Sequence, residues 1–215
     1  MQRRNGFSLV EILVVIAIIG VLAVMVAANW QNLILYSQRT ASLSNLRQIG
    51  AGFFAYAGDN EMRLPRRVTN TNESAKWPRL IADYLGDVRV YAAVGDRSNF
   101  IFRRVDPLSD ALNNTSYIMN GYNDLGAYTN AAVEVRINQL DRPGGVILLG
   151  TPRLGSTHFY MDLVEGESGN HADVLNLTLY GKGSDYLFAD GSARFLSTNE
   201  YRPEMWLVNR DFSVP

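Results

Sequence analysis

The chain contains no cysteine and only two histidines among its 215 residues. The absence of cysteine excludes disulfides, thiol catalysis and zinc–thiolate sites together. The two histidines, His158 and His171, are too few for a histidine-rich metal centre. A domain of this composition must therefore be stabilised by its hydrophobic core, by a bound ion or by its neighbours.

The sequence also lacks an excess of charge of either sign. It has 20 Lys and Arg against 21 Asp and Glu, which gives a formal net charge of -1 at pH 7. No basic surface is expected, so nucleic acid is not predicted as a partner. Hydrophobic residues make up 47% and charged residues 19%, as in an ordinary folded domain.

Hydrophobicity is concentrated near the N-terminus. Residues 12–28 contain no charged side chain, and Arg3, Arg4 and Glu11 are the only charges before them. As a helix, residues 7–28 span roughly 33 Å, which matches a bilayer core of about 30 Å. The two arginines predict a single membrane pass with the N-terminus in the cytoplasm and the rest of the chain across the membrane.

Two readings of this segment compete, and Glu11 bears on the choice. In the first reading it is a secretory signal peptide, cleaved near Ala28 after the small residues 26–28. In the second it is a retained helix. A carboxylate costs on the order of 2.5–3.5 kcal/mol at the centre of a membrane helix, and a signal peptide gains nothing from it. Near the interface the side chain could also snorkel to water.

The six residues Gly6-Phe7-Ser8-Leu9-Val10-Glu11, followed by the apolar run, resemble the class III leader of type IV pilins and type II secretion pseudopilins. The resemblance implies that a prepilin peptidase cuts after Gly6 and that the new N-terminus, Phe7, is N-methylated. It also implies that Glu11 pairs with the charged amino group of Phe7 in an adjacent subunit. Such a charge in a helical bundle needs a partner, and the pair would set the stagger between subunits.

The helical pattern continues beyond the membrane segment. Apolar or small residues recur at three- and four-residue spacing up to the stop signal Gly58-Asp59-Asn60, which predicts one helix of about fifty residues. We recognise no capping signal at its start. The predicted division of the chain is a leader at 1–6, a membrane and filament-core helix at 7–28, the exported half of the helix at 29–58 and a head at 59–215. The residues of the stripe are Leu43, Leu46, Ile49, Gly50, Phe53 and Ala57.

Later blocks carry a second resemblance. Residues 116–121 and 186–191 are similar to segments of a bacterial group of pilin-like proteins with a C-terminal H-X9-DG region. His171 lies further from Asp190-Gly191 than that spacing requires, so the resemblance assigns it no role.

The head is expected to be α+β, with the long N-terminal helix packed on an antiparallel sheet. Asp190-Gly191 predicts a hairpin turn because glycine accepts a positive φ. Short β-prone runs separated by turn signals are the expected strands: 88–94, 100–105, 132–137, 146–149, 158–164, 174–180, 186–189 and 193–196.

The head offers little catalytic chemistry. It has no G-x-S-x-G nucleophile elbow and no complete phosphate loop, so we expect no enzymatic activity. Asp185 and Asp190, with loop carbonyls near Asn170, are candidate ligands for Ca²⁺, an idea motivated by the calcium of major pseudopilins. Asp190-Gly191 could equally serve only to turn the hairpin. No other cofactor is expected.

The sequence therefore predicts a structural subunit, a pilin or pseudopilin, of a type IV pilus-like or type II secretion filament. Its expected partners are the prepilin peptidase/methyltransferase, other pilin or pseudopilin subunits, an inner-membrane assembly platform and the membrane. It would reside in a bacterial inner membrane with a periplasmic or extracytoplasmic head, and then in the filament. The alternative is a membrane-tethered binding module for a polysaccharide or secreted cargo that does not polymerise.

Overall fold

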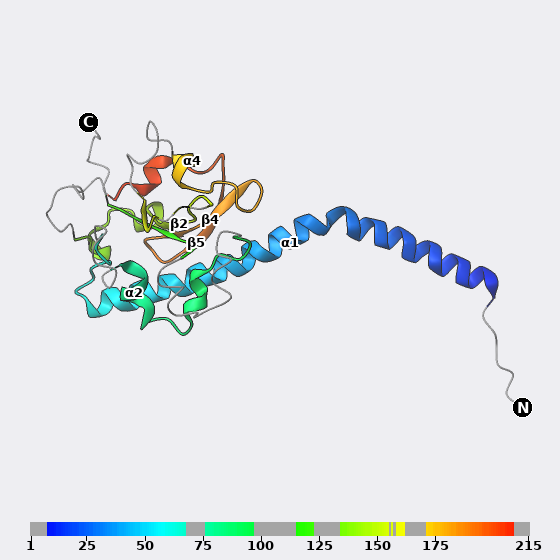
Figure 1. Cartoon of the computed structure of the whole chain (residues 1–215), viewed down its shortest axis with the longest axis horizontal. Helices are drawn as coiled ribbons and strands as arrows, with labels where there is room; N and C mark the ends of the chain where they lie inside the picture. Colours follow the sequence, from blue (N-terminus) through cyan, green and yellow to red (C-terminus); the bar gives the residue numbers. More distant parts are fainter. Residues whose placement is uncertain are drawn as a thin grey trace, which may run out of the picture. The chain divides into compact units, whose positions relative to one another are not determined.

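The computed structural model describes residues 8–67, 76–96, 115–122, 134–154, 156, 158–161 and 171–208. The chain divides into two compact units, Met1–Ser37 and Gln38–Pro215. The first contains the apolar part of a long helix. The second contains the rest of that helix and the head (Figure 1).

Helix α1 runs from Leu9 to Asp59, so the prediction of one helix of about fifty residues is confirmed. It ends at the predicted stop signal, where Glu61 and Met62 adopt positive φ angles of 56° and 62°. The buried side of the helix follows the predicted spacing, with Leu43 half-buried beside it. The buried residues are Ser42, Leu46, Ile49, Gly50, Gly52, Phe53 and Ala57.

The head is built on a five-stranded sheet of order β3-β1-β2-β4-β5. The α+β prediction is confirmed, with one difference. The β1–β3 pair is parallel, so the sheet is mixed rather than wholly antiparallel. The strands are β1 Ile118–Asn120, β2 Ile147–Gly150, β3 Tyr160–Met161, β4 Gly183–Phe188 and β5 Ala193–Ser197.

Strands β4 and β5 form the predicted hairpin around Asp190-Gly191. Gly191 has a φ of 82°, which is the left-handed region that a tight turn requires and glycine adopts without strain. Oδ1 of Asp190 accepts hydrogen bonds from the backbone nitrogen and the hydroxyl of Ser192, at 2.9 and 2.6 Å. Local turn chemistry thus fixes the register of this pair.

Three of the predicted strands are wrong where the structure describes them. Residues 88–91 form a 3-10 helix, because the Asp87 carboxylate caps it by accepting from the Arg89 backbone nitrogen. Residues 177–180 form turns, and residues 137–139 form a 3-10 helix after a single bridge at Arg136. The expected strand at 100–105 lies outside the described residues.

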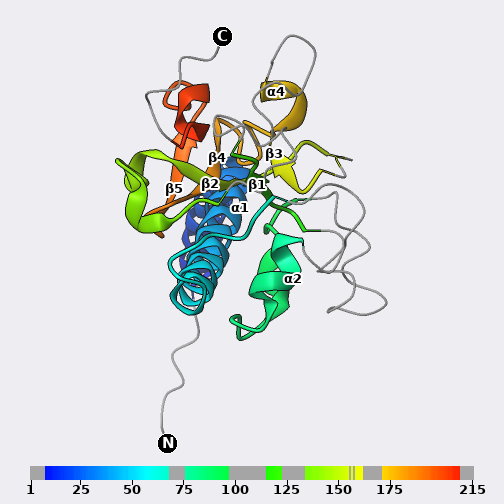
Figure 2. The same ribbon diagram turned by 90° about the vertical axis from the view of Figure 1, so that its left-hand side faces the viewer.

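Both faces of the sheet are covered. One face packs on the 42–57 stretch of α1 and on the short helix α2, Trp77–Ala82, which lies beside α1 (Figure 2). The rings of Phe53 and Trp77 stack there at 5.6 Å. Gly50 permits close approach, because a Cβ there would lie 2.9 Å from the side chain of Leu187.

The opposite face of the sheet carries a second apolar cluster. It is covered by helix α4, His171–Val174, and by the 3-10 helix η8, Pro203–Trp206. Tyr186 and Trp206 are almost completely buried in this cluster. Neighbouring residues of β4 therefore face two different environments, since side chains alternate along a strand.

Candidate functional site

Ser8 and Glu11 form a reciprocal cap at the start of α1. The backbone N–H of Ser8 donates to Oε2 of Glu11 at 2.7 Å, and the N–H of Val10 donates to Oγ of Ser8 at 3.3 Å. This is a capping box, which satisfies backbone donors that every helix start leaves unpaired. The prediction of a helix without a capping signal is wrong, and the S-x-x-E spacing of Ser8 and Glu11 is the signal that reveals the cap.

The Glu11 carboxylate is thus occupied by its own helix in the isolated chain. It is exposed, and a negative charge in the first helical turn is favoured by the helix dipole. Gly6 and Phe7, the predicted processing residues, lie outside the described residues. Cleavage, methylation and the Phe7–Glu11 pair therefore stay predictions.

Large apolar side chains cover the first part of α1 on all sides. Between Leu9 and Trp30 their exposed fractions run from 49% at Val14 to 81% at Leu9. Contiguous apolar surface of this extent marks a membrane or protein contact. By length and composition, α1 can cross a membrane.

The structure does not bring the two candidate calcium ligands together. Asp185 is completely buried in β4, whereas Asp190 lies in the hairpin turn and holds Ser192. The extended strand from Asp185 to the end of β4 at Phe188 alone spans roughly 10 Å before the turn begins, and two ligands of one ion must both come within 2.3–2.6 Å of it. Among the residues that the structure describes, no three acidic or histidine side chains gather as a metal site. These two carboxylates do not fit one calcium ion.

His171 is a packing residue in the described structure. Its Nδ1 lies 2.6 Å from the hydroxyl of Tyr201, which in turn accepts from Nε1 of Trp206 at 3.0 Å. Burial lowers the pKa of His171, and the charge of Glu204 opposes that effect. Hydrogen bonds through these three side chains connect α4 to η8.

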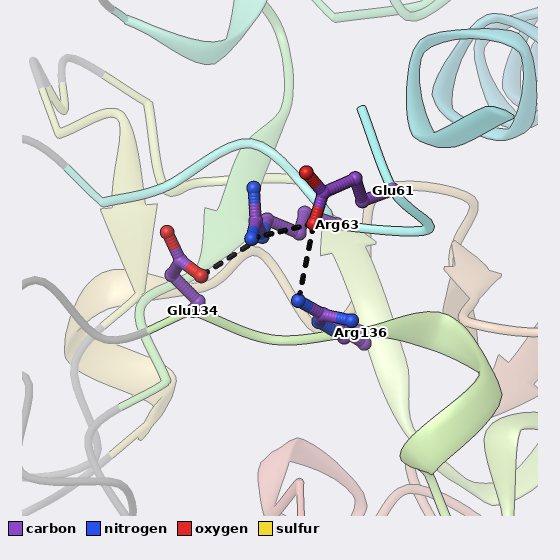
Figure 3. Close-up of polar contacts among 4 residues, drawn as sticks. All are labelled: Glu61, Arg63, Glu134 and Arg136. Atoms are coloured by element: carbon purple, nitrogen blue, oxygen red, sulfur yellow. Dashed lines mark hydrogen bonds and ion pairs between the residues drawn. The ribbon is translucent and has the colours of Figure 1, made fainter. Parts of the chain in front are cut away.

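A charged cluster that sequence reasoning missed lies just beyond the end of α1. Arg63 pairs with Glu61 at 2.7 Å and with Glu134 at 2.8 Å, and Arg136 pairs with Glu61 at 3.3 Å (Figure 3). A backbone bridge joins Arg63 to Arg136. The side chains are one-third to two-thirds exposed, so each pair contributes about 1 kcal/mol or less. The cluster fastens the segment after α1 to the head.

The comparisons with known proteins bear on the N-terminal segment. Residues 1–27 match the family model of the prokaryotic N-terminal methylation motif. No curated protein and no solved structure matches the chain.

The prepilin-type resemblance of the leader is therefore confirmed, and the motif indicates a type IV pilin- or pseudopilin-like subunit. It implies processing by a prepilin peptidase and association with a membrane, consistent with the exposed apolar helix. The H-X9-DG resemblance is not part of this match and stays a prediction.

Proposed function

We propose that the protein is a prepilin that is cut after Gly6, N-methylated at Phe7 and assembled as a structural subunit of a type IV pilus-like or type II secretion filament. The observation that carries the proposal is the methylation motif at residues 1–27. The motif continues directly into a helix whose apolar side chains are exposed among the residues that the structure describes.

The exposed helix supplies a surface suited to other helices. Residues on one side of it, at three- and four-residue spacing, line a shallow apolar groove. Small residues among larger ones let neighbouring helices approach closely. In the proposed filament, copies of this helix pack together in the core while the heads coat the outside. The groove residues are Ile19, Leu22, Ala23, Val26, Ala27 and Trp30.

The proposal also implies which partners the protein has and where it resides before and during assembly. Before assembly the chain sits in a bacterial inner membrane with its head periplasmic or extracytoplasmic. A prepilin peptidase/methyltransferase processes it, and an inner-membrane platform with a separate ATP-driven motor adds it to sibling subunits. The head has a structural role and no catalytic one.

The first experiment measures the N-terminal mass of the protein from native membranes. The expected mature chain begins at methylated Phe7. A chain beginning at Asn29, or an intact Met1, contradicts processing at Gly6. Gly6→Val is expected to block cleavage. Gly20→Val is the matched control, because a Cβ at Gly20 meets no described residue within 4 Å.

The second experiment tests assembly. Glu11→Ala is expected to leave the protein in the membrane and abolish its incorporation into sheared or purified filaments. Asp83→Ala removes an exposed carboxylate of the head and is expected to assemble normally. A processed, membrane-bound wild-type protein that never enters filaments would instead identify the tethered binding module.

A further inference from the structure

A buried carboxyl group without a hydrogen-bond partner lies between α1 and the sheet. Asp185 is the third residue of β4, and its side chain is 0% exposed. Neither of its oxygens makes a hydrogen bond to any residue that the structure describes. Acidic side chains are almost never fully buried unless they are paired, so this carboxyl calls for an explanation.

The groups from α1 that face the carboxyl do not pair with it. Ser42 is completely buried, and its hydroxyl lies 3.3 Å from that of Tyr117, near the carboxyl but outside hydrogen-bonding geometry to it. Phe195 of β5 stands directly across from Asp185 in the ladder. The guanidinium of Arg39 lies 3.9 Å from the centroid of the Phe195 ring, so this cation is held on an aromatic face.

The neighbouring tyrosines and Asp96 do not supply a compensating positive charge. Tyr117 and Tyr180 are kept neutral, because burial raises the pKa of both far above the usual range. Asp96 acts electrostatically on both hydroxyls and adds negative rather than positive potential. Arg47 is the second cation of α1 that acts on the carboxyl.

Burial is the largest influence on Asp185 itself. It raises the pKa from 3.8 to about 7, against the lowering effects of Arg39, Ser42 and Arg47. The buried site accommodates a neutral carboxyl. An ionised carboxyl needs water or a charged partner, and the packed interface provides neither water nor an ion pair. Any opening that hydrates Asp185 returns its pKa toward the ordinary value.

The consequence for stability follows from proton linkage. Between about pH 4 and pH 7 the closed form holds a proton that the open form has released, so the closed form weakens as the pH rises. Above pH 7 both forms are ionised, and the effect levels off. This direction is opposite to that of an ordinary ion-paired aspartate.

We propose that Asp185 is a proton-operated latch between β4 and residues 39–47 of α1. These helical turns stay packed on the sheet while the carboxyl carries its proton, and they open more readily as the carboxyl ionises. The latch belongs to the head and does not depend on filament assembly. In a head that faces an extracytoplasmic compartment, it makes the attachment of the helix respond to the acidity of that compartment.

Hydrogen exchange of the full chain in detergent micelles, between pH 5 and pH 8, tests the latch. After correction for intrinsic exchange, the protection of amides 42–50 is expected to fall by up to about tenfold per pH unit up to pH 7 and then to level off. Asp185→Asn mimics the neutral carboxyl and is expected to keep high protection at every pH. Asp190→Asn, at the exposed turn, should behave as wild type.

A pH dependence that is the same in Asp185→Asn as in wild type overturns the proposal. Arg39→Gln gives a second test, because Arg39 lowers the pKa of Asp185. In this variant the levelling-off should move to higher pH, and a move to lower pH contradicts the latch.

A direct measurement needs no variant. In wild type, the ¹³C resonance of the Asp185 carboxyl carbon is expected to titrate near pH 7, unchanged by calcium chloride or EDTA. A midpoint near pH 4 in the folded protein excludes the latch. A midpoint that calcium lowers assigns the residue to a metal site instead.

Discussion

The hydroxyl of Tyr201 lies 2.6 Å from Nδ1 of His171, a hydrogen bond between two side chains 30 residues apart in the sequence. The same hydroxyl accepts from Nε1 of Trp206 at 3.0 Å, because an indole nitrogen can only donate. Tyr201 is therefore the shared partner of two buried polar groups, one on α4 and one on η8.

Tyr201→Phe is expected to destabilise the head by about 1–3 kcal/mol, because it leaves Nε1 of buried Trp206 and Nδ1 of buried His171 without partners. The measurement is the free energy of unfolding from denaturant titration, followed by tryptophan fluorescence. Tyr84→Phe is the control, since the hydrogen bond from the Tyr84 hydroxyl to Asp59 is exposed. An effect equal to that of the control would show that the three-residue chain contributes nothing.

Gly191→Ala is expected to cost about 1–2 kcal/mol, because a residue with a Cβ is strained at φ 82°. The new Cβ would also lie 2.7 Å from the ring of Phe54, which must move aside. Gly58→Ala is the matched control near the end of α1, where an added Cβ meets nothing within 4 Å in the part of the chain that the structure describes. Thermal unfolding should show a lower midpoint for the first variant and an unchanged or slightly higher one for the second.

Features with a local cause could be predicted from the sequence. The spacing of Leu46, Ile49 and Phe53 shows which side of α1 is buried, and Asp190-Gly191 identifies the β4–β5 hairpin. The leader motif is a linear pattern that a peptidase reads in sequence, so it needs no fold to be recognised.

Features that depend on tertiary contacts could not be predicted in this way. β1 has three residues, all buried, which is too short to show alternation. The β-prone run from Val174 forms the end of a helix, a bridge and turns rather than a strand. Its apolar residues are nevertheless buried or partly buried against the apolar clusters of the head. From the sequence alone, an aspartate such as Asp185 is expected to be exposed. It is completely buried because α1 packs on β4.

Glu11→Gln separates the two roles of Glu11. The amide oxygen can still accept from the Ser8 backbone nitrogen and so retains the helix cap, but it carries no charge for an ammonium partner. The variant is expected to be cleaved and inserted normally while failing to assemble. Ser8→Ala does the reverse, since it weakens the cap by about 1 kcal/mol and leaves the charge. It should assemble, as measured by filament yield. Normal assembly of Glu11→Gln would show that the filament does not need the charge of Glu11.

His171 provides a pH dependence of opposite direction to that of Asp185. Burial holds the pKa of His171 below its ordinary 6.5, so the unfolded chain takes up a proton on this residue before the folded head does. Stability from this source is therefore present above pH 6.5 and lost as the pH falls below it.

The expected result is clearest in an Asp185→Asn background, which removes the opposing slope. There, the free energy of unfolding should decrease from pH 7 to pH 5, and adding His171→Asn should flatten the curve. The asparagine amide can accept from or donate to the Tyr201 hydroxyl, so the change isolates the titration from the hydrogen bond. His158→Asn replaces the other histidine, which is exposed, and should keep the decrease. If the slope survives His171→Asn but disappears in His158→Asn, the buried imidazole is not its source.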